Sequence, residues 1–339
     1  MKSHWNLALL ALSASLALPP AHAATCSSES QMEVSQRDTL ASAVRGIAAE
    51  VQQGNIQALQ AQTIPAVASN FGGIAATVNR LKPLVQSATI TIDDLYALDA
   101  STEPANAPQT QFFCGTRIVA LTFHNLPPGK YALAIVHATG VPNPQQMSLI
   151  LSESSPNHWM LAGFLAKPMV EAGHSGLWYW KQARNYASRK QDWAAWFYYQ
   201  TAADLLSPAP FVASPNLQKL DQEMNAAKPP NLPGATPMML SVNGSSFEIM
   251  SAGITTTFGT FDLEVQYQPS TAQQAALQNP TTARSQVVSV MTALLTQYPE
   301  LRSAFHGIWV RANQGNSTVF ALDLPMNQIP GTNGITPQA

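Results

Sequence analysis

The chain has few charged residues, because Asp, Glu, Lys and Arg make up only 11% of its 339 residues, against roughly 25% in an average soluble protein. Its 17 Lys and Arg against 19 Asp and Glu residues give a formal net charge of -2. A nucleic-acid-binding surface needs basic residues gathered along a phosphate track, so we expect no nucleic-acid partner. The small net charge also excludes disorder driven by charge repulsion.

Long apolar runs are missing after the N-terminus, because no later segment reaches 18 consecutive apolar residues, about the shortest length of a membrane-spanning helix. Residues 1–23 combine Lys2, an apolar stretch over residues 7–18 and Ala21-His22-Ala23 before a cleavage point. This pattern predicts a secretory signal peptide. We expect an exported protein, periplasmic or secreted, with no stable membrane insertion after signal cleavage. An uncleaved anchor is the alternative.

Cysteine is also scarce, since Cys26 and Cys114 are the only two in the chain. In the oxidising compartment that the signal indicates, two cysteines predict a disulfide. It would attach the start of the mature chain to a central strand. The alternative is acylation of Cys26 in a lipoprotein, although the small residue that such a site needs just before the cysteine is replaced by Thr25.

Residues 24–168 show a helical period followed by a strand period. Apolar residues recur on one face over 30–62, where Leu40, Val44, Ile47 and Val51 are spaced as in a helix, and a second helix is expected over 66–85. The period then changes to two, which predicts strands. The expected strands cover residues 89–92, 112–123, 131–138, 147–151 and 159–165, with 131–138 pairing with 112–123 as a hairpin.

Helices followed by antiparallel strands that end in the segment Asn157-His158-Trp159-Met160-Leu161-Ala162-Gly163-Phe164 resemble an NTF2-like (cone-shaped α+β) domain over residues 30–168. The resemblance implies a curved antiparallel sheet wrapped on the N-terminal helices. That fold hosts both enzymes and non-catalytic binding cones, so it leaves the function open.

Residues 169–208 predict a helical hairpin. Trp180, Ala183, Ala203 and Pro208 are similar in position to the residues of a single tetratricopeptide-like unit, and there is no second copy at the repeat period. One such unit cannot bury both of its faces. We therefore expect this hairpin to pack on a neighbouring domain.

The rest of the chain predicts a proline-rich linker over 209–237, a second small α+β domain of β-β-β-α-β-β order over 238–325, and a flexible tail over 326–339. Asn243-Gly244 marks a tight hairpin turn in that domain, and residues 282–298 have the apolar stripe of an amphipathic helix. The expected fold class is therefore α+β, with helices packed on a curved antiparallel sheet, a helical hairpin and a second α+β domain.

No catalytic or metal-binding motif stands out, and we expect no cofactor and no metal site. The histidines lack the spacing of metal ligands. His124 and His137 lie on strands expected to pair. Together with Asp94 they form the alternative hypothesis, a hydrolase or other small-molecule enzyme that uses residues lining the cone.

The unusual feature of the sequence is a cluster of aromatic residues. The segment 178–199 gathers candidate binding residues of large apolar area with a polar edge, which are Trp178, Tyr179, Trp180, Trp193, Trp196 and Tyr199. They are either the core between two domains or a groove for a protein, peptide or glycan partner. The leading hypothesis is an exported, non-enzymatic binding or assembly protein of the cell envelope.

Overall fold

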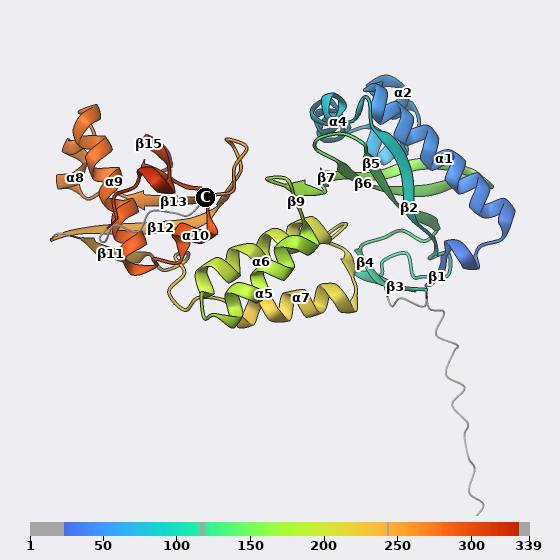
Figure 1. Ribbon diagram of the computed structural model, residues 1–339. Helices are drawn as coiled ribbons and strands as arrows, with labels where there is room; N and C mark the ends of the chain where they lie inside the picture. The colour runs from blue at the N-terminus through green and yellow to red at the C-terminus, as the bar shows by residue number, and fades with distance from the viewer. Residues whose placement is uncertain (1–23, 116–118, 243, 332–339) are drawn as a thin grey trace, which may run out of the picture.

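The computed structural model describes residues 24–115, 119–242 and 244–331. The signal-peptide prediction therefore lies outside the described residues. Over these residues the chain is a mixed α+β protein whose sheets are mostly antiparallel, and none of the sheets described closes into a barrel. It forms an N-terminal lobe and a C-terminal lobe joined by a layer of helices (Figure 1).

The N-terminal lobe is built on a five-stranded antiparallel sheet of order β1-β2-β5-β6-β7. Its strands are β1 (Thr25–Ser28), β2 (Thr89–Asp99), β5 (Lys130–Thr139), β6 (Gln145–Ser155) and β7 (His158–Pro168). The helices before β2 are α1 (Val34–Gln53), α2 (Ile56–Ala61), α3 (Pro65–Ala68) and α4 (Gly72–Val85), after a short 3-10 turn at Glu29–Gln31. Residues of α1 and α4 share one apolar core with β2, β5, β6 and β7.

The predicted apolar face of the first helix is confirmed. Leu40, Val44, Ile47 and Val51 are all buried in the core beneath α1, because their spacing places them on one side of the helix. The helix ends at Gly54, whose φ of 70° lies in the left-handed region. A glycine adopts that conformation without the strain of a Cβ atom.

A second sheet of three strands has the order β10-β4-β3, formed by β3 (Gln109–Cys114), β4 (Val119–His124) and β10 (Val212–Ala213). The prediction of one strand over 112–123 is therefore wrong, because β3 and β4 are separate strands that pair with each other. Gly115, with a φ of 68°, ends the first of them. The expected pairing of 131–138 with this segment is also wrong, since β5 pairs with β2 and β6.

The predicted disulfide is confirmed, with Cys26 and Cys114 bonded at an S–S distance of 1.98 Å. Cys26 lies on β1 and Cys114 on β3, and both are outer strands of their sheets. The bond therefore links the edges of the two sheets. The expectation that it reaches a central strand is wrong, because the apolar run that suggested such a strand is divided at Gly115.

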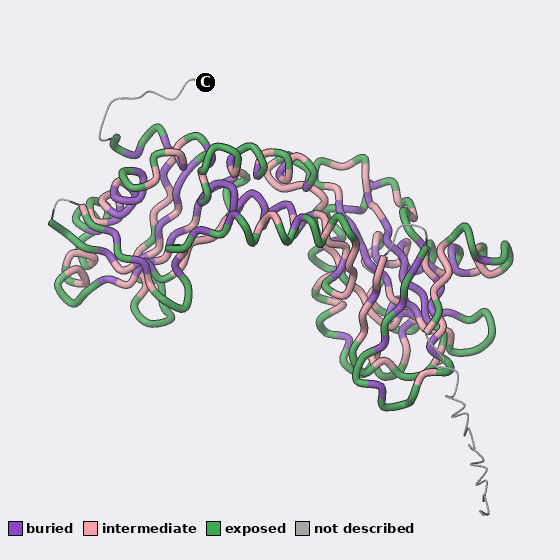
Figure 2. The backbone as a smooth tube through the Cα atoms, turned by 90° about the horizontal axis from the view of Figure 1, so that it is seen from below, coloured by how far each residue is buried: buried purple, intermediate pink, exposed green. Residues whose placement is uncertain are grey.

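The helical layer follows β7 through two short strands, β8 (Val170–Glu171) and β9 (His174–Ser175). It consists of α5 (Gly176–Ser188), α6 (Asp192–Leu206) and α7 (Pro215–Ala226). Residues of α5 and α6 belong to the same apolar core as the C-terminal sheet. Buried residues, purple in Figure 2, continue from this layer into the C-terminal lobe. The segment 209–237, expected to be a linker, contains β10 and α7.

The C-terminal lobe has a five-stranded sheet of order β11-β12-β13-β14-β15. Its strands are β11 (Met238–Val242), β12 (Ser245–Thr255), β13 (Asp262–Gln268), β14 (Gly307–Gln314) and β15 (Ser317–Pro325). Its helices are α8 (Thr271–Ala276), α9 (Pro280–Gln297) and α10 (Leu301–Ala304), and a 3-10 turn at Met326–Gln328 follows β15. β13 and β14 run parallel, whereas the other pairs are antiparallel. The chain returns between β13 and β14 through α8, α9 and α10, and α9 packs on one face of the sheet.

Candidate functional site: a pocket between the lobes

The helical layer is joined to the N-terminal lobe by a return of the chain, which we call the strap, residues 207–213. After α6 the strap runs back to the N-terminal lobe, where the carbonyl of Pro208 accepts hydrogen bonds from Ser148 Oγ at 2.8 Å and Gln146 Nε2 at 3.3 Å. Its strand β10 then pairs with β4, and the chain turns into α7. The strap therefore ties the helical layer to both sheets of the N-terminal lobe.

A second tie is made by Lys167 at the end of β7. Its ammonium group donates to the carbonyls of Asp204, at 2.6 Å, and Ser207, both at the C-terminal end of α6. Carbonyls there have no partner within the helix, and the negative end of the helix dipole favours a cation. Burial lowers the pKa of Lys167 to about 8, against the opposing influence of the Asp204 carboxylate. The lysine side chain thus fixes α6 against β7.

Between the N-terminal lobe and the helical layer lies a cavity of about 250 Å³, which we call the interlobe pocket. Its walls come from β2, β4 and β5 of the N-terminal lobe and from α5, the end of α6, the strap and α7. Most of its lining is apolar and includes Val119, Leu133, Ile135, Leu177, Trp180, Leu206, Pro208, Val212 and Leu217. The polar lining consists of Asp94, Tyr96, Ser214 and Asn216. Leu177 lines the pocket and keeps 65% of its surface exposed.

Trp180 is the aromatic wall of this pocket and is held in one orientation. Its indole Nε1 donates to Glu223 Oε2 at 2.7 Å, and the Arg184 guanidinium lies 4.4 Å above its ring. Arg184 also makes two hydrogen bonds to the Glu223 carboxylate, at 2.7 and 2.9 Å. Burial would raise the pKa of Glu223, but the hydrogen bonds from Arg184 and Trp180 outweigh it and lower that pKa. Because α7 carries Glu223, it fixes the tryptophan of α5.

The other aromatic candidates do not line the interlobe pocket. Tyr179, Trp193, Trp196 and Tyr199 are buried in the core that α5 and α6 share with the C-terminal sheet. Trp178 is half-buried and stacks on the His174 ring at 3.7 Å, with 7° between the ring planes. Of the six candidates, only Trp180 therefore reaches the pocket.

The three residues of the enzyme alternative are not brought together on one sheet. His124 ends β4 in the three-stranded sheet, whereas His137 lies on β5, where its Nδ1 is 3.7 Å from Asp93 Oδ1. Asp94 does line the pocket, and Tyr96 donates to its carboxylate at 3.3 Å. Neither histidine is among the described lining residues of that pocket. The strand pairing that would have placed them side by side was wrong.

Comparisons with protein-family models, curated proteins and solved structures gave no match. The function is therefore argued from the site itself. Among the described residues, no helix is both long enough and apolar enough to cross a bilayer, and no three His, Cys, Asp or Glu side chains gather as metal ligands.

Sequence reasoning missed most of the pocket. Leu133 and Ile135 belong to a strand whose pattern predicts core positions. Leu206 and Pro208 end the stretch predicted as a helical hairpin, and Val212 lies in the predicted linker. One sequence feature could have indicated the pocket. Leu177 is an apolar residue near the start of the predicted helix and lies outside the stripe of aromatic residues on that helix. The walls lie up to 123 positions apart, from Asp94 to Leu217 (217 minus 94), and local periodicity carries no information on such distances.

Proposed function

We propose that this chain is an exported, non-enzymatic binding or assembly protein of the cell envelope, and that its interlobe pocket holds an apolar side chain of a polypeptide partner. The observation that carries the proposal is the pocket itself, a cavity with mostly apolar walls and one fixed tryptophan. Exposed apolar surface around a concave site is typical of protein-binding sites, and tryptophan and arginine are enriched where binding energy concentrates.

The size of the pocket favours a side chain over a whole small molecule. At about 250 Å³ it is smaller than the roughly 300–1,000 Å³ of sites that enclose drug-sized ligands. A tryptophan side chain from a partner would occupy most of such a volume, and a smaller leucine side chain would fit inside it. The ties made by Lys167 and the strap hold both walls in place, so little ordering is required when the side chain enters.

Export is supported by the Cys26–Cys114 disulfide, because such bonds persist in oxidising compartments. As part of the same proposal, residues 30–168 form an NTF2-like cone and residues 177–208 a tetratricopeptide-like hairpin. The packing of α1 and α4 on the five-stranded sheet supports the first likeness. The contact between α5 and α6, which share one core, supports the second.

The pocket can be tested with amino-acid amides that carry single side chains, using the full mature chain. We expect N-acetyl-tryptophanamide and N-acetyl-leucinamide to shift NMR signals of Leu133, Ile135 and Trp180, with dissociation constants of about 1 mM. N-acetyl-asparaginamide should not shift them, because its side chain gains nothing from an apolar cavity.

Leu177→Asp is the decisive variant, since it places a carboxylate in the apolar lining of the pocket and should abolish these shifts. Leu177 is 65% exposed, so the substitution leaves the core intact. Val34→Asp is its matched control: Val34 is 61% exposed in the first turn of α1, where an acidic residue is favourable. Equal shifts with the asparagine amide, or shifts unchanged in Leu177→Asp, would contradict the proposal.

A further inference from the structure

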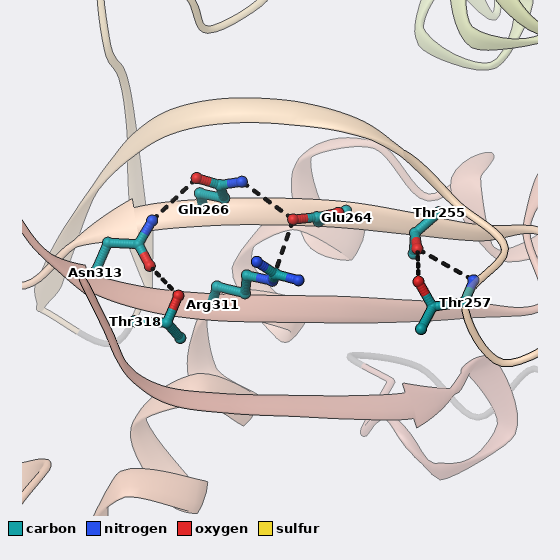
Figure 3. A network of polar contacts seen from close by, with 7 residues as sticks. All are labelled: Thr255, Thr257, Glu264, Gln266, Arg311, Asn313 and Thr318. Atoms are coloured by element: carbon teal, nitrogen blue, oxygen red, sulfur yellow. Dashed lines mark hydrogen bonds and ion pairs between the residues drawn. The ribbon is translucent and has the colours of Figure 1, made fainter. Parts of the chain in front are cut away.

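The face of the C-terminal sheet opposite α9 carries a connected row of polar side chains. Leu263 and Val265 of β13 point into the core, so the residues that alternate with them face the other way. We define the open face by Glu264 and Gln266 of β13, Arg311 and Asn313 of β14 and Thr318 of β15 (Figure 3).

Hydrogen bonds join these side chains across three strands. Thr318 Oγ1 donates to Asn313 Oδ1 at 2.8 Å, and Asn313 Nδ2 donates to Gln266 Oε1 at 2.9 Å. Gln266 Nε2 donates in turn to Glu264 Oε1 at 3.0 Å. The side-chain amides of Asn313 and Gln266 each carry two N–H donors. Each donates one hydrogen bond within the row, which leaves its second N–H to donate to a ligand. Because the side chains orient one another, the row is preorganised.

The charges of the open face compensate each other. Arg311 Nε lies 3.2 Å from Glu264 Oε1, and both side chains remain partly exposed, at 32% and 19%. An ionic ligand would therefore meet no net charge in this row. A purely apolar partner would cover the second amide donors without replacing their hydrogen bonds to water, which is unfavourable. A neutral ligand that both donates and accepts hydrogen bonds fits the row best.

Aromatic rings lie at one end of the row. The Arg311 guanidinium stacks 4.0 Å from the Trp309 ring, and Phe258 meets that ring edge-on at 5.4 Å. Phe258 is 56% exposed, so its ring offers an apolar surface beside the polar row. Sugars combine hydroxyl groups with apolar C–H faces, and an aromatic ring next to planar polar side chains matches both.

We propose that the open face binds a neutral oligosaccharide. Its hydroxyls exchange hydrogen bonds with Gln266, Asn313 and Glu264, and the C–H face of one sugar unit packs on Phe258. The two proposals are separate, because the open face lies on the C-terminal sheet, whereas the interlobe pocket is lined by the N-terminal lobe and the helical layer, and the two share no residue.

The test uses saturation-transfer difference NMR on the full mature chain with four neutral probes: maltohexaose, cellohexaose, chitohexaose and mannohexaose. We expect at least one to bind with a dissociation constant of about 1 mM or lower. Phe258→Ala and Asn313→Ala should each weaken that binding about tenfold, the ratio given by the loss of one packed ring or one good hydrogen bond. Leu177→Asp, in the interlobe pocket, should leave it unchanged.

Three results would overturn the proposal. The first is no transfer to any of the four sugars at about 10 mM, a concentration that detects even weak binding. The second is binding that neither Phe258→Ala nor Asn313→Ala weakens. The third is concentration-dependent self-association in sedimentation velocity that Phe258→Ala abolishes while no sugar binds, since the open face would then be an interface between proteins. Failure of the amide probes at the interlobe pocket would leave the oligosaccharide site standing.

Discussion

Removing the disulfide should destabilise the N-terminal lobe and leave the rest of the chain unchanged. The change is the double substitution Cys26→Ala and Cys114→Ala, which leaves no free thiol. The bond closes a loop with a sequence separation of 88 residues, and in the chain-entropy model a loop of that length contributes about 4–5 kcal/mol by restricting the unfolded state.

The effect should be confined to one transition, because the two cysteines belong to a core of the N-terminal lobe that is separate from the core shared by α5, α6 and the C-terminal sheet. For a domain of this size each kcal/mol shifts the melting temperature by roughly 2–4 °C. Differential scanning calorimetry should therefore show the N-terminal transition lowered by about 8–20 °C and the C-terminal transition unmoved.

Ser30→Ala is the matched control, since Ser30 is an exposed residue of the same N-terminal segment and its loss should shift neither transition. The reasoning would be refuted if the double variant lowered the N-terminal transition by less than about 3 °C. It would also be refuted if both transitions fell together, because the lobes would then unfold as one unit.

Two further predictions concern the helical layer. Lys167→Met should change how stability depends on pH. Burial lowers the pKa of Lys167 in the folded protein from its ordinary 10.5 to about 8, so the unfolded chain binds more protons between these values, and the wild type gains stability as pH rises from 8 to 10.5. Urea unfolding at pH 7.5 and 10 should show this gain reduced in the variant, and equal gains in both proteins would contradict it. Trp193→Ala should cost about 3–5 kcal/mol, because Trp193 is 2% exposed and packs 4.7 Å from the Tyr298 ring. Trp178→Ala, at a half-buried position, should cost clearly less in the same denaturation experiment, and a near-neutral Trp193→Ala would assign that ring to a surface.

Features that depend on neighbouring residues could be predicted from the sequence. The helical period of Leu40, Val44 and Ile47 identified a face that is buried. The Cys26–Cys114 disulfide could be predicted because the chain contains only these two cysteines. In both cases the decisive information lies in one short pattern or in one residue type.

Features that depend on pairing between distant segments could not be predicted. The apolar run that begins at Phe112 has the same composition whether it forms one strand or the hairpin of β3 and β4. Gly115, which ends β3, interrupts the run by a single residue. The aromatic residues of α5 and α6 pack against Phe261 and Phe305, a contact that no local period records. The open face was missed because its polar residues alternate with core residues and look like ordinary solvent-facing positions.

The strap sets an order of events while the chain is being made. β10 completes the three-stranded sheet of the N-terminal lobe, yet it ends at Ala213, 45 residues after β7 ends at Pro168 (213 minus 168). Ribosomes add about 5–20 residues per second, so a nascent N-terminal lobe waits roughly 2–9 s with the edge of β4 unpaired. During that interval the edge is open to other strands, and a factor that holds the chain unfolded until export would protect it.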